Sequence, residues 1–308
     1  MRAKVRLLYF KHSRGSLSTN VIREICSYFA DLLLAQVTSS TLRFYNCHTC
    51  TWEPQVLLRT PILVDMSSTL VVLKDDRVLS SGGGMPSSYW NAAYLLGNDG
   101  AVEQLPDMLI GRRSHGVIQV RHIYVFGGSS LYLGSAVHKK SDMFQSDYCR
   151  NYTAKKCEKI DLKCHNRTWL SLPDMREVRR ILNPCLFNGY VYICGSGSLL
   201  VEAFSPQTEH FLSFQLQHSP EFDCDLYVHN NLLVINSRSK FISRFEAGEA
   251  GQLAQHSQVN KQCLPPPPLP PFFWSSFQPV VDATKGLYYI PQFGKILCFN
   301  METGLQVS

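Results

Sequence analysis

The segment LPDMLIGRRSHGVIQVRHIYVFGG, residues 105–128, contains the clearest repeat unit of the sequence. Its opening Leu-Pro-Asp-Met recurs at 172–175, and in both copies a pair of arginines begins four residues after the methionine. Two short, mainly apolar runs follow, at 116–120 and 123–126, and a polar pair separates them. Because these runs are rich in β-branched and aromatic residues, they predict a β-hairpin. A recurring hairpin indicates a repeat fold.

Similar hairpins are predicted along the rest of the chain, at 69–82, 185–195, 225–235 and 279–290. A second pair of strands follows them, most clearly at 92–105 and 159–172. Four strands in each repeat is the number found in a blade of a β-propeller. We therefore predict an all-β propeller.

These units resemble kelch repeats. The matching residues are 112–116, 123–128 with its terminal double glycine, 159–162 and 169–175. In the kelch family the double glycine ends the second strand, while an aromatic residue in the third strand and a tryptophan in the fourth pack between blades. The resemblance implies a kelch-type propeller over residues 31–308, preceded by a basic arm and a short helix at 1–30.

We expect six four-stranded blades, at 31–65, 66–108, 109–175, 176–220, 221–264 and 272–308. The first of these units has no clear innermost strand. A strand from Val5 to Phe10 would complete it, or the last blade would be shared between the two ends of the chain.

The composition is that of a globular protein, since 45% of the 308 residues are hydrophobic and 18% are charged. This excludes a largely disordered chain. No apolar run reaches the roughly eighteen residues that a membrane-spanning helix needs. The net charge of +6 comes from residues 1–23, which carry six basic side chains and no acid, so the remainder has 24 of each sign. We therefore expect no nucleic-acid-binding face.

The eleven cysteines are an odd number, and we expect no secretory signal ahead of them. They are therefore interpreted as reduced thiols, which predicts a cytoplasmic location. The basic, acid-free start also has the composition of a mitochondrial transit peptide, so a mitochondrial location is the alternative.

Residues 17–29 predict a short helix, because their apolar residues fall at helical spacing behind a serine or threonine cap. The helix resembles the opening of an F-box, a module that docks substrate adaptors onto cullin-type ubiquitin ligases. The resemblance implies that Val21, Ile22, Ile25 and Phe29 contact a ligase subunit. The alternative is a helix that plugs one face of the propeller.

Arg112, Arg113, Arg179 and Arg180 lie in connections between predicted blades. In kelch propellers such connections surround the central funnel, and their arginines often bind acidic or phosphorylated peptides. The guanidinium group is suited to this role because it binds a carboxylate with two parallel hydrogen bonds. In the alternative interpretation, one arginine of each pair binds carbonyl groups of the blade or pairs with Asp107 or Asp174.

Residues 129–156 form a long insertion inside the third blade, and loops of this length usually bind something or are disordered. Its aromatic and basic residues suit an acidic partner; those that we predict to bind one are Tyr132, Lys139, Lys140, Tyr148, Arg150 and Tyr152. A second candidate is the proline-rich run Pro265–Pro271, which resembles ligands of WW domains. Its alternative is a stiff linker between blades.

Metal and catalytic signals are weak. Cys47-His48-Thr49-Cys50 has the spacing of a zinc site but lacks a second half, so we interpret it as a turn. No hydrolase, phosphate-binding, metalloprotease or dinucleotide motif occurs, and His115 is interpreted as a structural histidine. We predict a non-enzymatic protein-interaction propeller without metal or cofactor. A ubiquitin-ligase adaptor is the first alternative and a copper enzyme similar to galactose oxidase the second.

Overall fold

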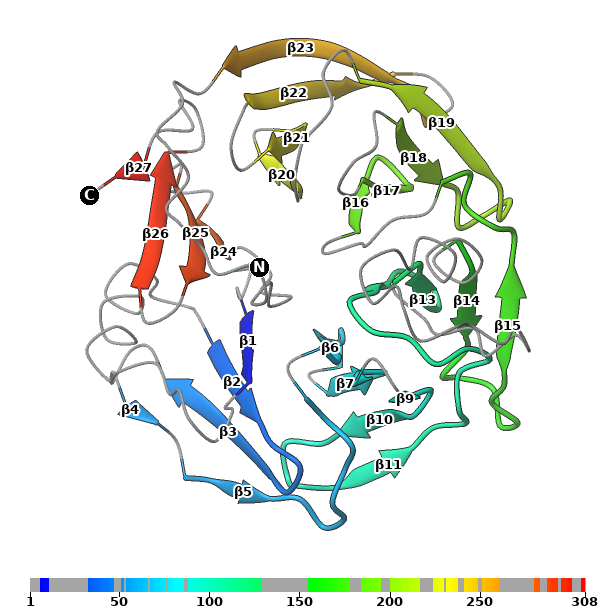
Figure 1. Cartoon of the computed structure of the whole chain (residues 1–308), viewed down its shortest axis with the longest axis vertical. Coiled ribbons are helices and arrows are strands. Elements are labelled where there is room, and N and C mark those ends of the chain that lie inside the picture. The colour runs from blue at the N-terminus through cyan, green and yellow to red at the C-terminus, as the bar shows by residue number, and fades with distance from the viewer. Residues whose placement is uncertain are drawn as a thin grey trace, which may run out of the picture.

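The computed structural model describes residues 6–10, 33–46, 51–52, 54–65, 67–75, 77–85, 88–128, 155–177, 184–194, 200–216, 224–229, 231–237, 241–248, 251–260, 280–282, 287–292, 295–300 and 306–307. The regular elements among these residues are β-strands. They form six larger sheets that stand around a common centre, as in a β-propeller (Figure 1). The prediction of an all-β propeller is confirmed.

The first three sheets are formed by residues from 6 to 172. Their strands are β1 (Arg6–Phe10), β2 (Leu33–Val37), β3 (Thr41–Asn46), β4 (Thr51–Trp52) and β5 (Val56–Leu57); β6 (Thr69–Val72), β7 (Val78–Ser81), β10 (Ala93–Leu96) and β11 (Val102–Gln104); and β12 (Gly116–Gln119), β13 (Ile123–Phe126), β14 (Cys157–Ile160) and β15 (Trp169–Leu172).

The last three sheets contain four strands each. These are β16 (Cys185–Phe187), β17 (Tyr190–Ile193), β18 (Leu200–Phe204) and β19 (Phe211–Gln215); β20 (Cys224–His229), β21 (Leu232–Ser237), β22 (Phe241–Ala247) and β23 (Leu253–Asn260); and β24 (Val280–Asp282), β25 (Leu287–Gln292), β26 (Lys295–Asn300) and β27 (Gln306–Val307). In the second to sixth sheets the strands pair antiparallel, and the chain runs from an innermost strand to an outermost one (Figure 1).

The first sheet resolves the question of how the ring begins. β1 pairs in parallel with β2, with Arg6 opposite Leu33 and Phe10 opposite Val37. The strand expected from Val5 to Phe10 therefore supplies the missing inner position. The last sheet consists of β24 to β27, all from the C-terminal part of the chain. The alternative of a blade shared between the two ends is not what the structure shows.

One small hairpin departs from the predicted pattern. β8 (Gly84–Met85) and β9 (Ser88–Tyr89) pair with each other in the connection that runs from β7 to β10 of the second sheet. The sequence predicted a hairpin at 69–82 and strands at 92–105 but no element between them, so this hairpin was not predicted. The expected helix at 17–29 lies outside the described residues. Within the described chain, no helix is long and apolar enough to cross a membrane.

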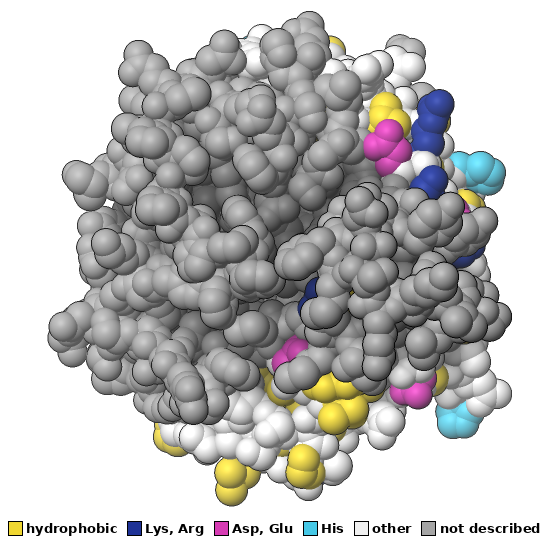
Figure 2. All heavy atoms as spheres, viewed as in Figure 1, with side chains coloured by type: hydrophobic (Ala, Val, Ile, Leu, Met, Phe, Trp, Pro, Cys, Tyr) yellow, Lys and Arg dark blue, Asp and Glu magenta, His cyan; other side chains and the backbone are white. Residues whose placement is uncertain are grey.

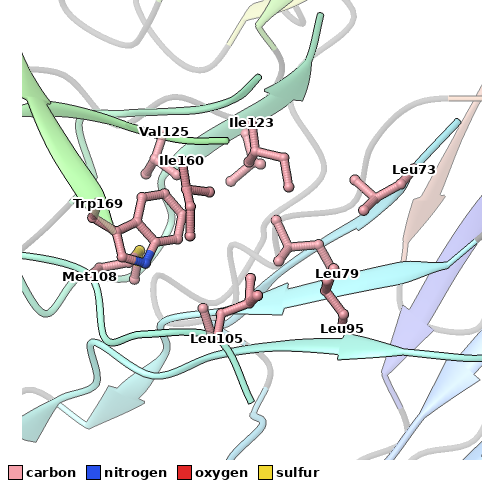
Figure 3. Packing of buried hydrophobic residues seen from close by; sticks show 11 residues of the cluster. Leu73, Leu79, Leu95, Leu105, Met108, Ile123, Val125, Ile160 and Trp169 are labelled. Carbon is pink, nitrogen blue, oxygen red and sulfur yellow. The ribbon is translucent and has the colours of Figure 1, made fainter. Parts of the chain in front are cut away.

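The repeated Leu-Pro-Asp-Met segment fills the space between neighbouring sheets. Leu105 and Met108 are buried with Ile123, Ile160 and Trp169 between the second and third sheets (Figure 3). In addition, the Trp169 Nε1–H donates a hydrogen bond of 2.7 Å to the Pro106 carbonyl. The tryptophan of the fourth strand thus packs between blades, as the kelch resemblance implies.

The second copy has the same role one seam further along. Leu172 and Met175 are buried with Tyr124, Phe126 and Phe204 between the third and fourth sheets. The backbone repeats as well, because the Met108 and Met175 N–H groups donate to the Asn91 and Lys155 carbonyls, each two residues before the third strand of its own sheet. The sequence repeat is therefore a structural repeat.

Gly128, the second residue of the double glycine after β13, has a positive φ of 95°. A Cβ atom at this position would lie 2.8 Å from the Arg113 carbonyl oxygen and 2.8 Å from the His115 Cβ. Both the backbone conformation and the close approach of the arginine connection therefore require glycine here.

Candidate functional site

The candidate site lies where the second and third sheets meet, at the end of the blades that we call the loop face: residues 65, 67–68, 82–85, 88–92 and 105–115. Backbone hydrogen bonds join these connections, and three of them involve the arginine connection and its next residue, Ser114. The Arg112 N–H donates to the Trp90 carbonyl at 3.0 Å, the Gly83 N–H to the Arg112 carbonyl at 2.9 Å, and the Ser114 N–H to the Ser67 carbonyl at 3.1 Å. The loops are therefore held together as one rigid surface.

Arg112 is fully buried below this surface, with 0% of its side chain exposed. Its guanidinium forms an ion pair with Glu158 of β14. It also donates to the Gly127 carbonyl at 2.8 Å and to the Lys156 carbonyl at 2.9 Å. Arg112 therefore has no donor left on the surface, and its assignment to partner binding is corrected to an internal role. The alternative, that one arginine binds carbonyl groups of the blade, describes it well, although the acid is Glu158 and not Asp107.

The Gly127 and Lys156 carbonyl groups also connect Arg112 to the insertion. Gly127 precedes the insertion, and Lys156 is its last residue. The Gly127 N–H also donates to the Lys156 carbonyl at 3.1 Å. Arg112 therefore fixes both ends of the insertion beside the loop face.

Glu158 has a counterpart in the next sheet. Glu158 is 1% exposed and accepts the Leu109 N–H at 2.7 Å, directly after Met108. Glu202 in β18 is 0% exposed and accepts the Arg176 N–H at 2.6 Å, directly after Met175. A buried glutamate in the third strand is therefore part of the repeat. Neither glutamate was predicted from the sequence, although Glu202 lies inside an otherwise apolar strand, which was a usable signal.

Arg113 has a different environment from its neighbour. Its guanidinium carbon lies 5.0 Å from the centroid of the Tyr89 ring, at the end of the β8–β9 hairpin. Both side chains are half-buried. Among the described residues, Arg113 has no carboxylate partner and no hydrogen-bond acceptor for its guanidinium. Because none of the described residues accepts from the guanidinium, its N–H donors can bind an anion while the tyrosine ring contacts the cation.

His115 is enclosed beneath the same connections. Its Nε2 lies 2.9 Å from the Ser81 Oγ, and both residues are 1% exposed. Burial, and to a lesser extent the charge of Arg112, hold the pKa of His115 well below its ordinary value. Its Nδ1 has no hydrogen-bond partner within the described chain. The prediction of a structural histidine agrees with this enclosed, neutral imidazole.

Cys157, opposite Phe126 in the third sheet, is also enclosed. Burial raises the pKa of its thiol to about 12, more than the nearby Arg112 lowers it. The thiol is therefore protonated at neutral pH, and a protonated thiol is a poor nucleophile.

The remaining predicted site residues lie outside the described residues. These are Arg179, Arg180, Tyr132, Lys139, Lys140, Tyr148, Arg150, Tyr152, Val21, Ile22, Ile25, Phe29 and the run Pro265–Pro271. Cys47 and Cys50 are outside as well. Within the described part of the chain, no group of three or more His, Cys, Asp or Glu side chains is arranged to hold a metal ion. These assignments, including the ligase-adaptor alternative, stay predictions.

Exposed apolar side chains gather near the site. Figure 2 shows them over β5 and the neighbouring sheet of β6, β7, β10 and β11. Leu57, Leu63 and Leu109 are the exposed leucines of this part of the chain, at 70%, 50% and 57%. Leu109 belongs to the same connection as Arg113, so the loop face offers apolar surface as well as a cation that has no acceptor among the described residues.

No protein-family model matches the sequence, and no curated protein matches it. The fold is similar to solved lyase structures. One is a selenomethionine-substituted virginiamycin B lyase from Staphylococcus aureus, 9% identical, with 88% of this chain and 79% of that chain covered and a TM-score of 0.48. Another is a catalytically inactive form of that enzyme with quinupristin, 8% identical, with 86% and 78% covered and a TM-score of 0.49. A streptogramin B lyase is 10% identical, with 88% and 78% covered and a TM-score of 0.49.

These similar structures are enzymes, which contradicts the prediction that the chain has no enzymatic activity. That prediction is therefore withdrawn. At 8–10% identity the likeness concerns the fold, and it transfers no lyase activity to this chain. Neither membership of the kelch family nor an F-box is shown by these comparisons.

Proposed function

We propose that this propeller binds a partner protein through the loop face at the seam of the second and third sheets, and that the bound segment is acidic. The observation that carries the proposal is the Arg113 guanidinium, which lies over the Tyr89 ring and whose edge N–H donors have no acceptor among the described residues. A carboxylate accepts two parallel hydrogen bonds from such an edge. Because the stack is already formed, little conformational entropy is lost on binding.

The surroundings of Arg113 favour a protein over a small anion. Leu109 is 57% exposed in the same connection, and Tyr89 and Trp90 are half-exposed beside it. Protein interfaces are rich in tyrosine, tryptophan and arginine, with apolar contacts around the charged group. The residues predicted in the insertion belong to the same proposal, since Arg112 holds both ends of the insertion next to this surface.

We further infer that the fold is a kelch-type propeller, and that this protein is cytoplasmic. The first inference is supported by the Gly127-Gly128 pair that ends β13 and by Trp169, which packs between sheets. The second is supported by the odd number of cysteines in the sequence.

An array of peptides that contain Asp or Glu among apolar residues tests the proposed function. The wild-type protein is compared with Arg113→Ala, Arg113→Lys and Arg121→Ala. Arg121 is the matched control, because it is an exposed arginine in the turn between β12 and β13, at the opposite end of the third sheet. We expect some of these peptides to bind the wild type and Arg121→Ala equally well. The same peptides should bind Arg113→Lys weakly and should not bind Arg113→Ala.

Binding should also weaken with added salt, because screening acts on exposed charge pairs. An Arg113→Ala protein that retains every peptide of the wild type would overturn the proposal.

A further inference from the structure

We propose that Asp65 is a positioning residue that sets the geometry of the Arg113–Tyr89 stack, an inference that rests on the proposed function of that stack. Asp65 does not touch either partner of the stack. It lies in the connection between β5 and β6, and its carboxylate is joined by hydrogen bonds to the segments that carry both of them.

The first part of the argument is the turn that Asp65 forms. Its Oδ1 accepts the Ser67 N–H at 2.9 Å, the Ser68 N–H at 3.0 Å and the Ser67 hydroxyl at 2.8 Å. The Ser68 hydroxyl reaches the same oxygen at 3.2 Å and the Gly82 carbonyl at 2.8 Å. One oxygen of the carboxylate therefore organises the turn and binds it to the glycine connection of the second sheet.

The second oxygen of the Asp65 carboxylate is connected to Tyr89 through Gly84. Asp65 Oδ2 accepts the Gly84 N–H at 3.0 Å. Gly84 is the first residue of β8, and its partner in the β8–β9 hairpin is Tyr89. The hairpin has only two residues in each strand, and isolated hairpins are marginally stable in water. An anchor at Gly84 therefore fixes the position of the tyrosine ring.

The turn that Asp65 forms is also connected to the backbone next to Arg113. The Ser67 carbonyl accepts the Ser114 N–H at 3.1 Å, directly after Arg113. Ser114 has a positive φ of 50°, which is uncommon for a residue with a side chain and needs support from its surroundings. The Asp65 turn therefore supports the backbone on the arginine side as well. One carboxylate thus fixes the two halves of the stack relative to each other.

A spectroscopic signal separates positioning from general stabilisation. We expect the ring current of Tyr89 to shift the Arg113 Nε–H resonance, so this resonance reports the contact between the ring and the guanidinium in a ¹H–¹⁵N spectrum. Arg113→Lys assigns the resonance, and Tyr89→Leu gives its position without the ring. The Arg112 Nε–H resonance is an internal reference for an intact seam.

The variants are Asp65→Asn and Asp65→Ala. Asparagine keeps one acceptor oxygen for the Ser67 and Ser68 contacts but cannot accept from Gly84, so it releases the hairpin with the least effect on folding. The control is Asp99→Asn. Asp99 also accepts an N–H two residues ahead, from Ala101 at 3.1 Å, in the turn between β10 and β11 away from the site.

We expect both Asp65 variants to move the Arg113 signal towards its position in Tyr89→Leu, with the Arg112 signal and the Asp99→Asn spectrum unchanged. For peptides that bind the wild type, affinity should fall about two- to tenfold, because one or two side chains must then be ordered on binding. An Arg113 signal that stays at its wild-type position in folded Asp65→Asn would overturn the proposal.

The two proposals can fail separately. If no acidic peptide binds the wild type, the proposed function fails, and the spectrum still decides the role of Asp65. If binding depends on Arg113 but is the same in Asp65→Asn, the proposed function stands and the positioning role fails.

Discussion

Arg112 and Arg113 are neighbours in the chain, yet they belong to two different regions of the molecule. Arg112 points into the seam between the second and third sheets, where its donors meet Glu158 and three carbonyl groups, of Ile110, Gly127 and Lys156. Arg113 lies on the loop face over Tyr89, with no acceptor among the described residues. A buried guanidinium with all its partners stabilises the fold, whereas a half-exposed one without a partner is available to another molecule.

The two arginines show which part of the molecule the repeat determines. The repeat accounts for the buried seam, whereas the proposed binding surface depends on a further element. The buried position is tied to features that recur in the next sheet, since Glu158 and Glu202 each accept the N–H that follows a repeated methionine. The exposed position depends on the β8–β9 hairpin, a separate two-stranded sheet in the connection between β7 and β10. The repeat therefore specifies the seam, and the added element specifies the surface.

The largest expected effect comes from Arg112→Ala. It leaves the Glu158 carboxylate buried without its cation, so we expect the free energy of unfolding to fall by about 3–5 kcal/mol. Chemical denaturation measures this. Arg113→Ala is the matched control and should change stability by no more than about 1 kcal/mol, the contribution of its contact with Tyr89. Equal denaturation midpoints for the two variants would contradict the contrast between the arginines.

A smaller loss is expected from Gly83→Ala, directly beneath the hairpin. Gly83 has a φ of 108°, and a Cβ there would lie 2.1 Å from the Ser68 Oγ and 2.7 Å from the Asp65 Oδ1. Backbone strain and this overlap together should lower stability by about 2–4 kcal/mol.

Gly189→Ala is the matched control for this test. Gly189 has a φ of 80° in the turn between β16 and β17, but nothing lies within 4 Å of the added Cβ. Only the cost of the backbone conformation remains, about 1–2 kcal/mol. Similar losses in both variants would show that the site is no tighter than an open turn.

The blades could be predicted from the sequence because the patterns that indicate their strands are local in the chain. Each hairpin needs only two apolar runs and a turn pair, so β12 with β13 and β16 with β17 were predicted. β8 and β9 were not, because strands of two residues beside three glycines have no detectable period. The inner strand of the first sheet was one of two options, since its pairing depends on a distant segment.

The site was predicted only in part for the same reason. Arg113 was identified from its arginine pair, but Tyr89 and Asp65 were not, because they reach Arg113 only through the fold. The partner of Arg112 was sought close by in the chain, at Asp107. The structure supplies Glu158 instead, 46 residues away in the third strand of the next sheet. Spacing along the chain cannot show which acid faces a seam.

The third prediction concerns the pH dependence of the buried seam. His115 has a pKa well below its ordinary 6.5 because burial disfavours the imidazolium. Below pH 6.5 the unfolded chain binds a proton at this residue and the folded chain does not, so stability falls as the pH falls. Between pH 7 and pH 5 the wild type should lose about 1–2 kcal/mol more than His115→Gln. Urea denaturation at several pH values measures the difference, and parallel curves for both proteins would contradict a neutral buried His115.

The smallest expected effect is the coupling between Arg113 and Tyr89 on the loop face. A stack of this kind at a partly exposed position contributes about 0.5–1 kcal/mol, which corresponds to a two- to fivefold change in affinity. Tyr89→Phe keeps the ring and should bind acidic peptides as the wild type does, whereas Tyr89→Leu should bind more weakly. A double-mutant cycle of Tyr89→Leu with Arg113→Ala, measured by fluorescence polarisation, isolates the interaction. If the two substitutions are additive, the ring does not orient the guanidinium, and Arg113 acts as a simple surface charge whose contribution disappears with salt.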